Sequence, residues 1–348
     1  MPTISIDTFF ACTLMVSVVI ISSILLTGTL NAQMASVKDL NQDEYFRALS
    51  EYVLLNTGAP ANWGSDSTIG PSSFGLAKQG SLRSYELDID KTSRLNSQNA
   101  FALTYPEILT AAGLSDIALG ISISQMMNVS ISLSANSTSP QSVMYTFRIS
   151  VSQDGAGVET SLHCYTVARN FLSDSYNSTS ADGTGYFDVE LPNASNGTAL
   201  LVVFARAFQD SRITAYGVYS FQHLSSQPQP ENTIFSLSPL NYTLFLNSAY
   251  SNFTVENCYA FSYGYQSNLT ATSNETYAIP TISETSPMVL ITSASNASTY
   301  FINWTSYPQV PLEAGADFQN SESYAFSYLV TIKGTLYNLV LRFGGISP

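Results

Sequence analysis

Charged residues are scarce in this sequence of 348 residues. They make up 11% of the chain, against about 25% in typical soluble domains. Only 12 residues are Lys or Arg, none of them between Arg212 and Lys333, and the net charge is −13. Because such a surface repels phosphate backbones, the composition excludes a nucleic-acid-binding protein, and we expect no nucleic acid among its partners.

Histidine is scarcer still, which argues against metal chemistry. The two histidines are His163 and His223. His163 precedes Cys164, but adjacent residues of a strand point to opposite faces, so the two would not meet in a Cys-His dyad. With only one other histidine, the chain also has too few ligands for a zinc site. Asp88 and Asp90 would face one side of an extended segment, as a metal site requires. No third ligand is identifiable, so a solvated strand face is the favoured interpretation.

The sequence also lacks the motifs of common catalytic sites. No Gly-x-Ser-x-Gly segment occurs, and the short Gly-x-Gly pieces do not lie between a strand and a helix. We therefore predict that the protein is not an enzyme and has no catalytic, cofactor-binding or metal-binding residues.

Cys164 and Cys258 are the two cysteines outside the apolar N-terminal run. They would form a disulfide in an exported chain or remain buried free thiols in strands, and the sequence leaves both open.

One long stretch, from Phe9 to Leu30, carries no charge at all. As a helix, it would rise about 33 Å, enough to cross a hydrocarbon core of about 30 Å. No Lys or Arg precedes it, and it is longer than the apolar core of a signal peptide. An uncleaved, single-pass membrane anchor is therefore favoured over a cleaved signal.

Two observations disagree about the side of the membrane on which the chain lies. Lys38 and Arg47 follow the apolar run, which favours a cytoplasmic location by the positive-inside rule. Eleven Asn-x-Ser/Thr acceptors, all after residue 127, favour export, and we give them more weight. We therefore expect a protein of the cell membrane with the bulk of its chain extracellular. The candidate glycosylation sites are Asn128, Asn136, Asn177, Asn193, Asn196, Asn241, Asn252, Asn268, Asn274, Asn296 and Asn303.

Apolar periodicity predicts a mainly β protein with a long N-terminal helix. Three- to five-residue spacing extends the helix to about residue 56, so residues 1–56 are expected to form a transmembrane and extended helix. Residues 57–116 are typical of a small membrane-proximal module of helices and loops, with one helix opening at Pro106 and ending at Gly113. Alternating segments predict an immunoglobulin-like β-sandwich over 117–224, a linker over 225–232 and a second β domain over 233–348.

Three turn signals mark expected hairpins. Asp154-Gly155 lies within VMYTFRISVSQDGAGVETSLHCYTVA, Asn196-Gly197 separates GYFDVELP from TALLVVFARA, and Lys333-Gly334 separates AFSYLVTI from TLYNLVLRF. Dipeptides of this kind favour two-residue hairpin loops. We expect each pair of flanking segments to form adjacent antiparallel strands.

The N-terminal third contains a recognisable combination of segments. ISIDTFF enters the apolar run with one acidic residue, Asp7; EYVLLNTGAPANWGS, SFGLA, YELDIDKTSRLN and YPEILTAAGL follow. Over about residues 4–115 this resembles archaeal membrane-anchored, type IV pilin-like surface proteins. The resemblance implies that Asp7 contacts a neighbouring subunit and neutralises its amino terminus; alternatively, the helix dipole stabilises Asp7 at the helix start. The chain departs from the pattern because only Met1 and Pro2 precede Thr3, without the usual processing site.

A second likeness concerns the strand-rich region. YTFRISVSQDGAGVETSLHCYTVARN and DGTGYFDVELP are similar to the immunoglobulin- or prealbumin-like modules of many exported proteins.

We predict a non-catalytic cell-surface glycoprotein, either a structural component of the cell envelope or a pilin-like filament subunit. Its partners would be the membrane, like subunits or other envelope proteins. The alternative is a monomeric, membrane-anchored adhesin or binding module that recognises a glycan or a protein. In that case a cluster of tyrosines would present an aromatic surface to a glycan rather than fill a core. These tyrosines are Tyr242, Tyr250, Tyr259, Tyr263 and Tyr265.

Overall fold

Antiparallel strands make up most of the chain described by the computed structural model, which confirms the predicted mainly β fold. The described residues are 13–22, 42–225, 235–248, 253–282, 287–295, 300–318 and 323–345. The chain divides into two units, residues 1–51 and 52–348, and each is described by itself.

The first unit is helical where the structure describes it, at residues 13–22 and 42–51. All residues from 13 to 22 are exposed. Among the described residues, no helix is both long and apolar enough to cross a membrane. More than half of the predicted span from Phe9 to Leu30, residues 23–41 of the expected long helix, and Asp7 lie outside the described residues.

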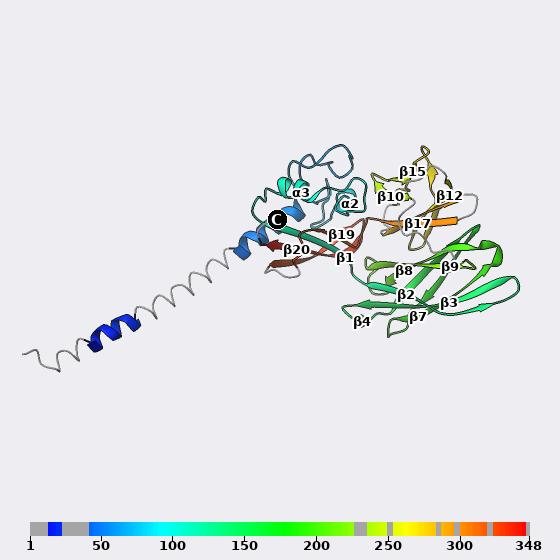
Figure 1. Ribbon diagram of the computed structural model, residues 1–348, viewed down its shortest axis with the longest axis horizontal. Coiled ribbons are helices and arrows are strands. Elements are labelled where there is room, and N and C mark those ends of the chain that lie inside the picture. The colour runs from blue at the N-terminus through cyan, green and yellow to red at the C-terminus, as the bar shows by residue number, and fades with distance from the viewer. Residues whose placement is uncertain are drawn as a thin grey trace, which may run out of the picture. The chain divides into compact units, whose positions relative to one another are not determined.

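Within the described residues, the second unit contains five antiparallel sheets, named A to E here (Figure 1). Sheet A holds β2 (Asn128–Thr138), β3 (Ser142–Gln153), β4 (Ala156–Gly157) and β7 (Thr184–Pro192). Sheet B holds β5 (Thr160–Ala168), β6 (Phe171–Ser178), β8 (Gly197–Ala207) and β9 (Thr214–His223). Sheet C holds β12 (Thr254–Ser262), β13 (Tyr265–Asn268), β16 (Met288–Ser295) and β17 (Tyr300–Tyr307). Sheet D holds β10 (Phe235–Leu240), β11 (Thr243–Ser248), β14 (Thr270–Ala271) and β15 (Thr276–Ala278). Sheet E holds β1 (Ala118–Gln125), β18 (Leu312–Gly315), β19 (Tyr324–Ile332) and β20 (Thr335–Gly344).

Sheet B is buried on both faces, because its inner strands β5 and β8 are nearly continuous apolar runs rather than alternating ones. Leu162 and Cys164 of β5 lie in the core shared with sheet A. Tyr165 and Val167 of the same strand lie in the core shared with sheet C. Sheets A and B therefore form a β-sandwich, and sheet C covers the other face of sheet B.

The strands do not follow the predicted domain limits. The first strand of the range 117–224, β1, pairs with β20 and β18 rather than with sheets A or B. Its register places Ile121 opposite Leu341 and Ile123 opposite Leu339. The range 233–348 supplies strands to three sheets, C, D and E. Alternation indicates which side chains are buried but not which strand lies alongside. Residues 226–232 of the expected linker lie outside the described residues.

One expected hairpin forms as predicted and two do not. Lys333-Gly334 connects the paired strands β19 and β20, which confirms that hairpin. Asp154-Gly155 is a turn, but the returning strand β4 is only two residues long before the chain crosses to sheet B. The hairpin expected at Asn196-Gly197 was wrong, because β7 pairs with β3 in sheet A while β8 lies in sheet B. The short helix η1 (Asn193–Ser195) makes the crossing.

The module over residues 57–116 contains the helices α2 (Ile89–Ser93) and α3 (Tyr105–Ala112). The helix predicted to open at Pro106 and end at Gly113 is confirmed as α3. Gly113 caps it with φ 70°, a left-handed conformation that glycine adopts without strain.

Asp88 and Asp90 do not share a strand face, because α2 begins between them. The Asp88 carboxylate caps this helix and accepts hydrogen bonds from the backbone N–H groups of Asp90 and Lys91. Asp90 is buried, and its Oδ1 accepts hydrogen bonds from Tyr307 OH at 2.6 Å and Asn241 N at 2.8 Å. These bonds fasten α2 to sheets C and D, so both aspartates have structural roles.

Cys164 and Cys258 are buried free thiols. Of the two alternatives that the sequence left open, a disulfide or free thiols in strands, the structure has the free thiols. Cys164 faces sheet A, whereas the Cys258 Sγ lies 3.5 Å from Thr292 Oγ1 of β16. The neighbours of Cys258, Tyr259 and Phe261, pack toward sheet B, so Cys258 points to the opposite face of sheet C. The two thiols therefore point away from each other across sheets B and C.

Candidate anion-binding site

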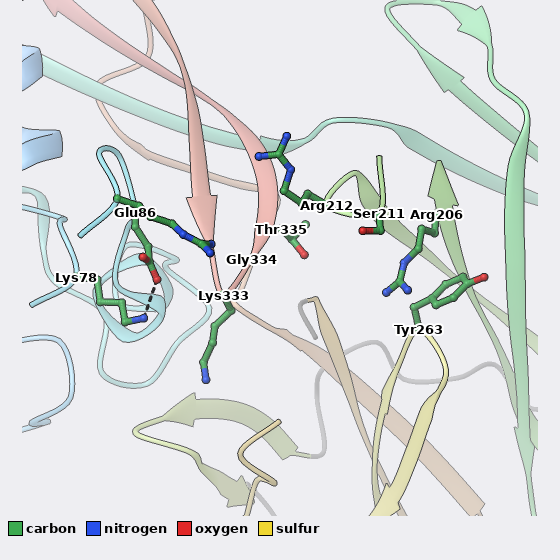
Figure 2. Close-up of a pocket in the computed structure, with 10 residues that line it drawn as sticks. Lys78, Glu86, Arg206, Ser211, Arg212, Tyr263, Lys333, Gly334 and Thr335 are labelled. Carbon is green, nitrogen blue, oxygen red and sulfur yellow. Dashed lines mark hydrogen bonds and ion pairs between the residues drawn. The ribbon is translucent and has the colours of Figure 1, made fainter. Parts of the chain in front are cut away.

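Basic side chains gather around one cavity of about 630 Å³ in the second unit. The lining comes from four segments: residues 78–86 of the module, the β8–β9 region, the β12–β13 turn and the β19–β20 turn (Figure 2). One carboxylate, Glu86, also lines the cavity, which leaves an excess of four positive charges. The basic residues are Lys78, Arg83, Arg206, Arg212 and Lys333.

The turn between β19 and β20 brings Lys333 to the cavity. Lys333 and Gly334 have φ values of 49° and 83°, the left-handed pair that fits the twist of a two-residue hairpin. The Lys333 Nζ lies 4.6 Å from the centroid of the Tyr242 ring, a cation–π contact. Burial, followed by the nearby Lys78 ammonium, lowers the pKa of Lys333. The two like charges therefore disfavour each other, and a bound anion would relieve this repulsion.

Arg206, near the end of β8, is held against an aromatic ring. Its guanidinium carbon lies 3.9 Å from the centroid of the Tyr263 ring (Figure 2). Its Nε donates to Thr214 Oγ1 at 3.2 Å. The Tyr263 hydroxyl in turn donates to Ser161 Oγ at 2.7 Å. These contacts fix the orientation of the guanidinium before any ligand arrives, which lowers the entropy cost of binding.

His163 supports the β12–β13 turn that carries Tyr263. Its Nδ1 accepts a hydrogen bond from the Gly264 N–H at 3.0 Å, so the ring proton belongs on Nε2, which lies 3.3 Å from Asp174 Oδ2. Burial lowers the pKa of His163 and favours this neutral form. Within the described part of the chain, no group of three or more His, Cys, Asp or Glu residues is placed to hold a metal ion.

Carboxylates already neutralise two of the five basic groups. Lys78 Nζ lies 2.7 Å from Glu86 Oε1, and Arg212 Nη2 lies 2.8 Å from Asp210 Oδ2. Among the residues that the structure describes, the other three have no carboxylate within ion-pair distance: Arg83, Arg206 and Lys333. These three are the groups best placed to bind an anion.

The expected glycosylation sites lie elsewhere. The structure describes nine of the eleven; Asn252 and Asn296 lie outside the described residues. Asn193 and Asn303 are half-buried. None of the nine lines the basic cavity. The remaining seven have exposed side chains, namely Asn128, Asn136, Asn177, Asn196, Asn241, Asn268 and Asn274.

The tyrosines considered for glycan binding do not form one surface. Tyr259 packs against the core between sheets B and C. Tyr263 lines the cavity beneath Arg206, and Tyr242 lies beneath Lys333. Tyr250 lies outside the described residues. Two of the five therefore position cations rather than stack on a sugar.

Sequence reasoning missed the basic cavity. Its basic residues are spread from Lys78 to Lys333, and no local motif links them. The one available signal in the sequence was the small number of basic residues, 12 in all. Five of these 12 meet at this cavity. Bringing them together required the strand order, which the sequence does not reveal.

Comparisons with known proteins add little. No family model matches the chain, and no curated protein matches it. It is similar to HBP35 of Porphyromonas gingivalis with a TM-score of 0.20 and 11% identity, over 52% of this chain and 63% of that one. It is similar to red sea bream transglutaminase with a TM-score of 0.22 and 8% identity, over 57% of this chain and 32% of that one. The chain thus spans less than two thirds of either structure, and neither likeness carries an argument.

Proposed function

We propose that this protein is a non-catalytic binding module of the cell surface that holds an anionic ligand in the basic cavity. The observation that carries the proposal is the gathering of five of 12 basic residues on one cavity, in a chain whose net charge is −13. Three of these cations have no carboxylate partner among the described residues. The ligand would supply the negative charge that they lack.

The cavity favours an organic polyanion over a single inorganic ion. Its volume of about 630 Å³ lies within the range of small-molecule sites, about 300–1,000 Å³. The basic groups come from separate segments, which suits a ligand with several sulfate, carboxylate or phosphate groups. Arg206 already occupies a face of the lining aromatic ring, Tyr263, so stacking of a nucleobase is disfavoured. An acidic oligosaccharide is the ligand class that we propose.

Calorimetric titration of the full chain in detergent tests this proposal. The probes are a heparin-derived sulfated tetrasaccharide, its desulfated counterpart and inorganic sulfate. We expect the sulfated tetrasaccharide to bind, the desulfated sugar not to bind, and affinity to fall as salt rises because the charges are screened. Equal binding of both sugars, or binding of neither, would overturn the proposal.

Two substitutions assign the binding to the cavity. Arg83→Gln and Lys333→Gln each remove one cation that has no carboxylate partner among the described residues. A hydrogen bond to a charged group contributes about 1.5–3 kcal/mol, so each should weaken binding roughly tenfold or more. Arg148→Gln is the matched control, because Arg148 is exposed on β3 and does not line the cavity. An equal loss in the control would show that only overall charge matters.

A structural subunit of the cell envelope, including a pilin-like filament component, is the second proposal. The helical residues 13–22 are uncharged, mostly apolar and all exposed. Such a surface needs lipid or the same helix of neighbouring copies as a partner. In a filament, Asp7 would contact a neighbouring subunit. Electron microscopy of the native material separates the proposals, since filaments support the subunit and dispersed particles support an anchored binding module.

We further propose that the apolar run within residues 1–56 anchors the protein and that the β-rich unit, with its immunoglobulin- or prealbumin-like sandwich, lies outside the cell. The exposed glycosylation acceptors support this orientation. Protease added to intact cells should digest the β-rich unit and leave an N-terminal fragment in the membrane. Full protection of the chain in intact cells would contradict the proposed location.

A further inference from the structure

The nine described Asn-x-Ser/Thr acceptors avoid the inner strands of every sheet. Asn128 and Asn136 lie on β2, the edge of sheet A, and Asn268 ends β13, an edge of sheet C. Asn177 and Asn303 lie on the edge strands β6 and β17. The other four lie in connections between strands: Asn193, Asn196, Asn241 and Asn274.

Side-chain hydrogen bonds divide these acceptors into two groups. In three of them the amide Nδ2 donates to a backbone carbonyl: Asn177 to Tyr186, Asn193 to Pro140 at 3.1 Å, and Asn303 to Phe235 at 2.6 Å. A glycan is attached to this same nitrogen and takes one of its two hydrogens, so the sugar would have to fit beside a native contact that the other hydrogen makes. The other six have exposed side chains whose amide nitrogens donate no hydrogen bond within the described residues: Asn128, Asn136, Asn196, Asn241, Asn268 and Asn274.

The edge strands β2 and β13 lack the residues that usually protect a sheet edge. Their sequences, NVSISLSANST and YQSN, contain no charged residue and no proline. The start of β2 is covered by β9, since a Cβ on Gly217 would lie 2.7 Å from the Val129 carbonyl oxygen. From residue 132 to 138 every residue of β2 is exposed, and one bulge interrupts its pairing with β3. The outer backbone groups of such strands offer a template for pairing with another chain.

We infer that glycans on Asn136 and Asn268 cover the open parts of these two edge strands and prevent strand addition by other chains, while Asn177, Asn193 and Asn303 stay unmodified. The bulky, solvated glycan takes the place of the lysines and prolines that β2 and β13 lack. This inference does not depend on the basic cavity or its ligand.

The modification needs a glycosyl donor, a lipid-linked sugar phosphate, from which a membrane enzyme of the cell transfers the sugar. The asparagine Nδ2 forms a bond to the anomeric carbon of the sugar while the bond from that carbon to the phosphate oxygen breaks. The amide proton is transferred to a base, and the lipid phosphate leaves with the bonding electrons. The chain contributes only the exposed acceptor.

Glycopeptide mass spectrometry of the native protein tests the assignment without any variant. We expect glycan mass on peptides that contain the six free acceptors and none on Asn177, Asn193 or Asn303. A glycan on any of these three, or unmodified asparagine at both Asn136 and Asn268, would overturn the inference.

Two double variants test the role of the glycans, each removing two acceptors. The edge variant carries Asn136→Gln and Asn268→Gln, and the matched control replaces the connection acceptors Asn241 and Asn274 with Gln. Light scattering after size exclusion should show a several-fold larger oligomer fraction for the edge variant than for the wild type, with thioflavin T binding. The control should resemble the wild type, and equal association of the two variants would refute a role specific to the edges.

Discussion

Replacing Asp90 with Asn should stabilise the protein at neutral pH. Asp90 is 5% exposed, and its Oδ1 accepts hydrogen bonds from Tyr307 OH and Asn241 N. Burial raises the pKa of Asp90 from 3.8 to about 6, although these two hydrogen bonds act in the opposite direction. Asn keeps an oxygen that accepts both bonds and removes the charge that burial disfavours.

Proton binding sets the direction and size of the effect. Between pH 4 and 6 the folded state holds a proton on Asp90 that the unfolded state releases. The resulting stability is fully present below about pH 4 and is lost as the pH rises through 6. A difference of about two pK units corresponds to about 3 kcal/mol. Asp90→Asn should therefore be more stable than the wild type by up to about 3 kcal/mol at pH 7.5 and should approach it at pH 4.

Guanidinium unfolding at constant ionic strength from pH 4 to 8 measures this difference, with the fluorescence of the buried Trp63 as one probe. His163 titrates in the opposite sense: burial lowers its pKa, so its contribution is lost as the pH falls. That term is common to both proteins and cancels in their difference. Asp88→Asn should reduce the pH dependence of the unfolding free energy, because the Asp88 charge also raises the pKa of Asp90, while Asn still caps the helix. Parallel pH curves for Asp90→Asn and the wild type would refute the reasoning.

Two other predictions concern buried groups. Lys91→Met should lower the unfolding free energy at neutral pH by about 2–4 kcal/mol, because it leaves the carbonyls of Thr57 and Ala77 without the ammonium that donates to each at 2.8 Å. Chemical unfolding measures the loss, and the exposed Arg148→Met should show little change. Iodoacetamide should label Cys164 and Cys258 only after unfolding and without any reductant, because both thiols are free and buried, and burial raises the pKa of Cys164 to about 12. Peptide mapping reads the labels, and labelling that required a reductant would instead indicate a disulfide.

Features set by a few neighbouring residues could be predicted from the sequence. Pro106 and Gly113 bound α3 as their backbone preferences require. Lys333-Gly334 forms the expected hairpin turn, because both residues adopt the left-handed conformation that a two-residue turn needs and β19 pairs directly with β20. The Asp154-Gly155 turn is also present, although only two residues of β4 follow it in the same sheet. The turn residues thus predicted where the chain changes direction, but they did not predict which sheet the following strand joins.

Features set by distant partners could not be predicted. The alternating pattern of β1 fits sheet A as well as sheet E, and its actual partner, β20, lies at the other end of the chain. The candidate site depends on the same long-range pairing, since it brings Lys333 of the last hairpin near Lys78 of the module. Asp88 and Asp90 show that a local pattern can also mislead. Their spacing suits a strand face, but the Asp88 cap begins a helix instead.

The position of the cavity couples ligand binding to the packing of the second unit. A ligand that contacts Arg83, Arg206 and Lys333 joins the module, sheet B and the β19–β20 turn, which otherwise meet around a cavity with an excess of positive charge. It binds only when these segments are packed together, so at a hundredfold excess over its Kd it would add about 2.7 kcal/mol to the unfolding free energy. Part of that gain comes from offsetting the repulsion that, with burial, lowers the pKa of Lys333 beside Lys78. The same anion that identifies the site should therefore also stabilise the fold, and the gain should be smaller in Lys333→Gln than in the wild type.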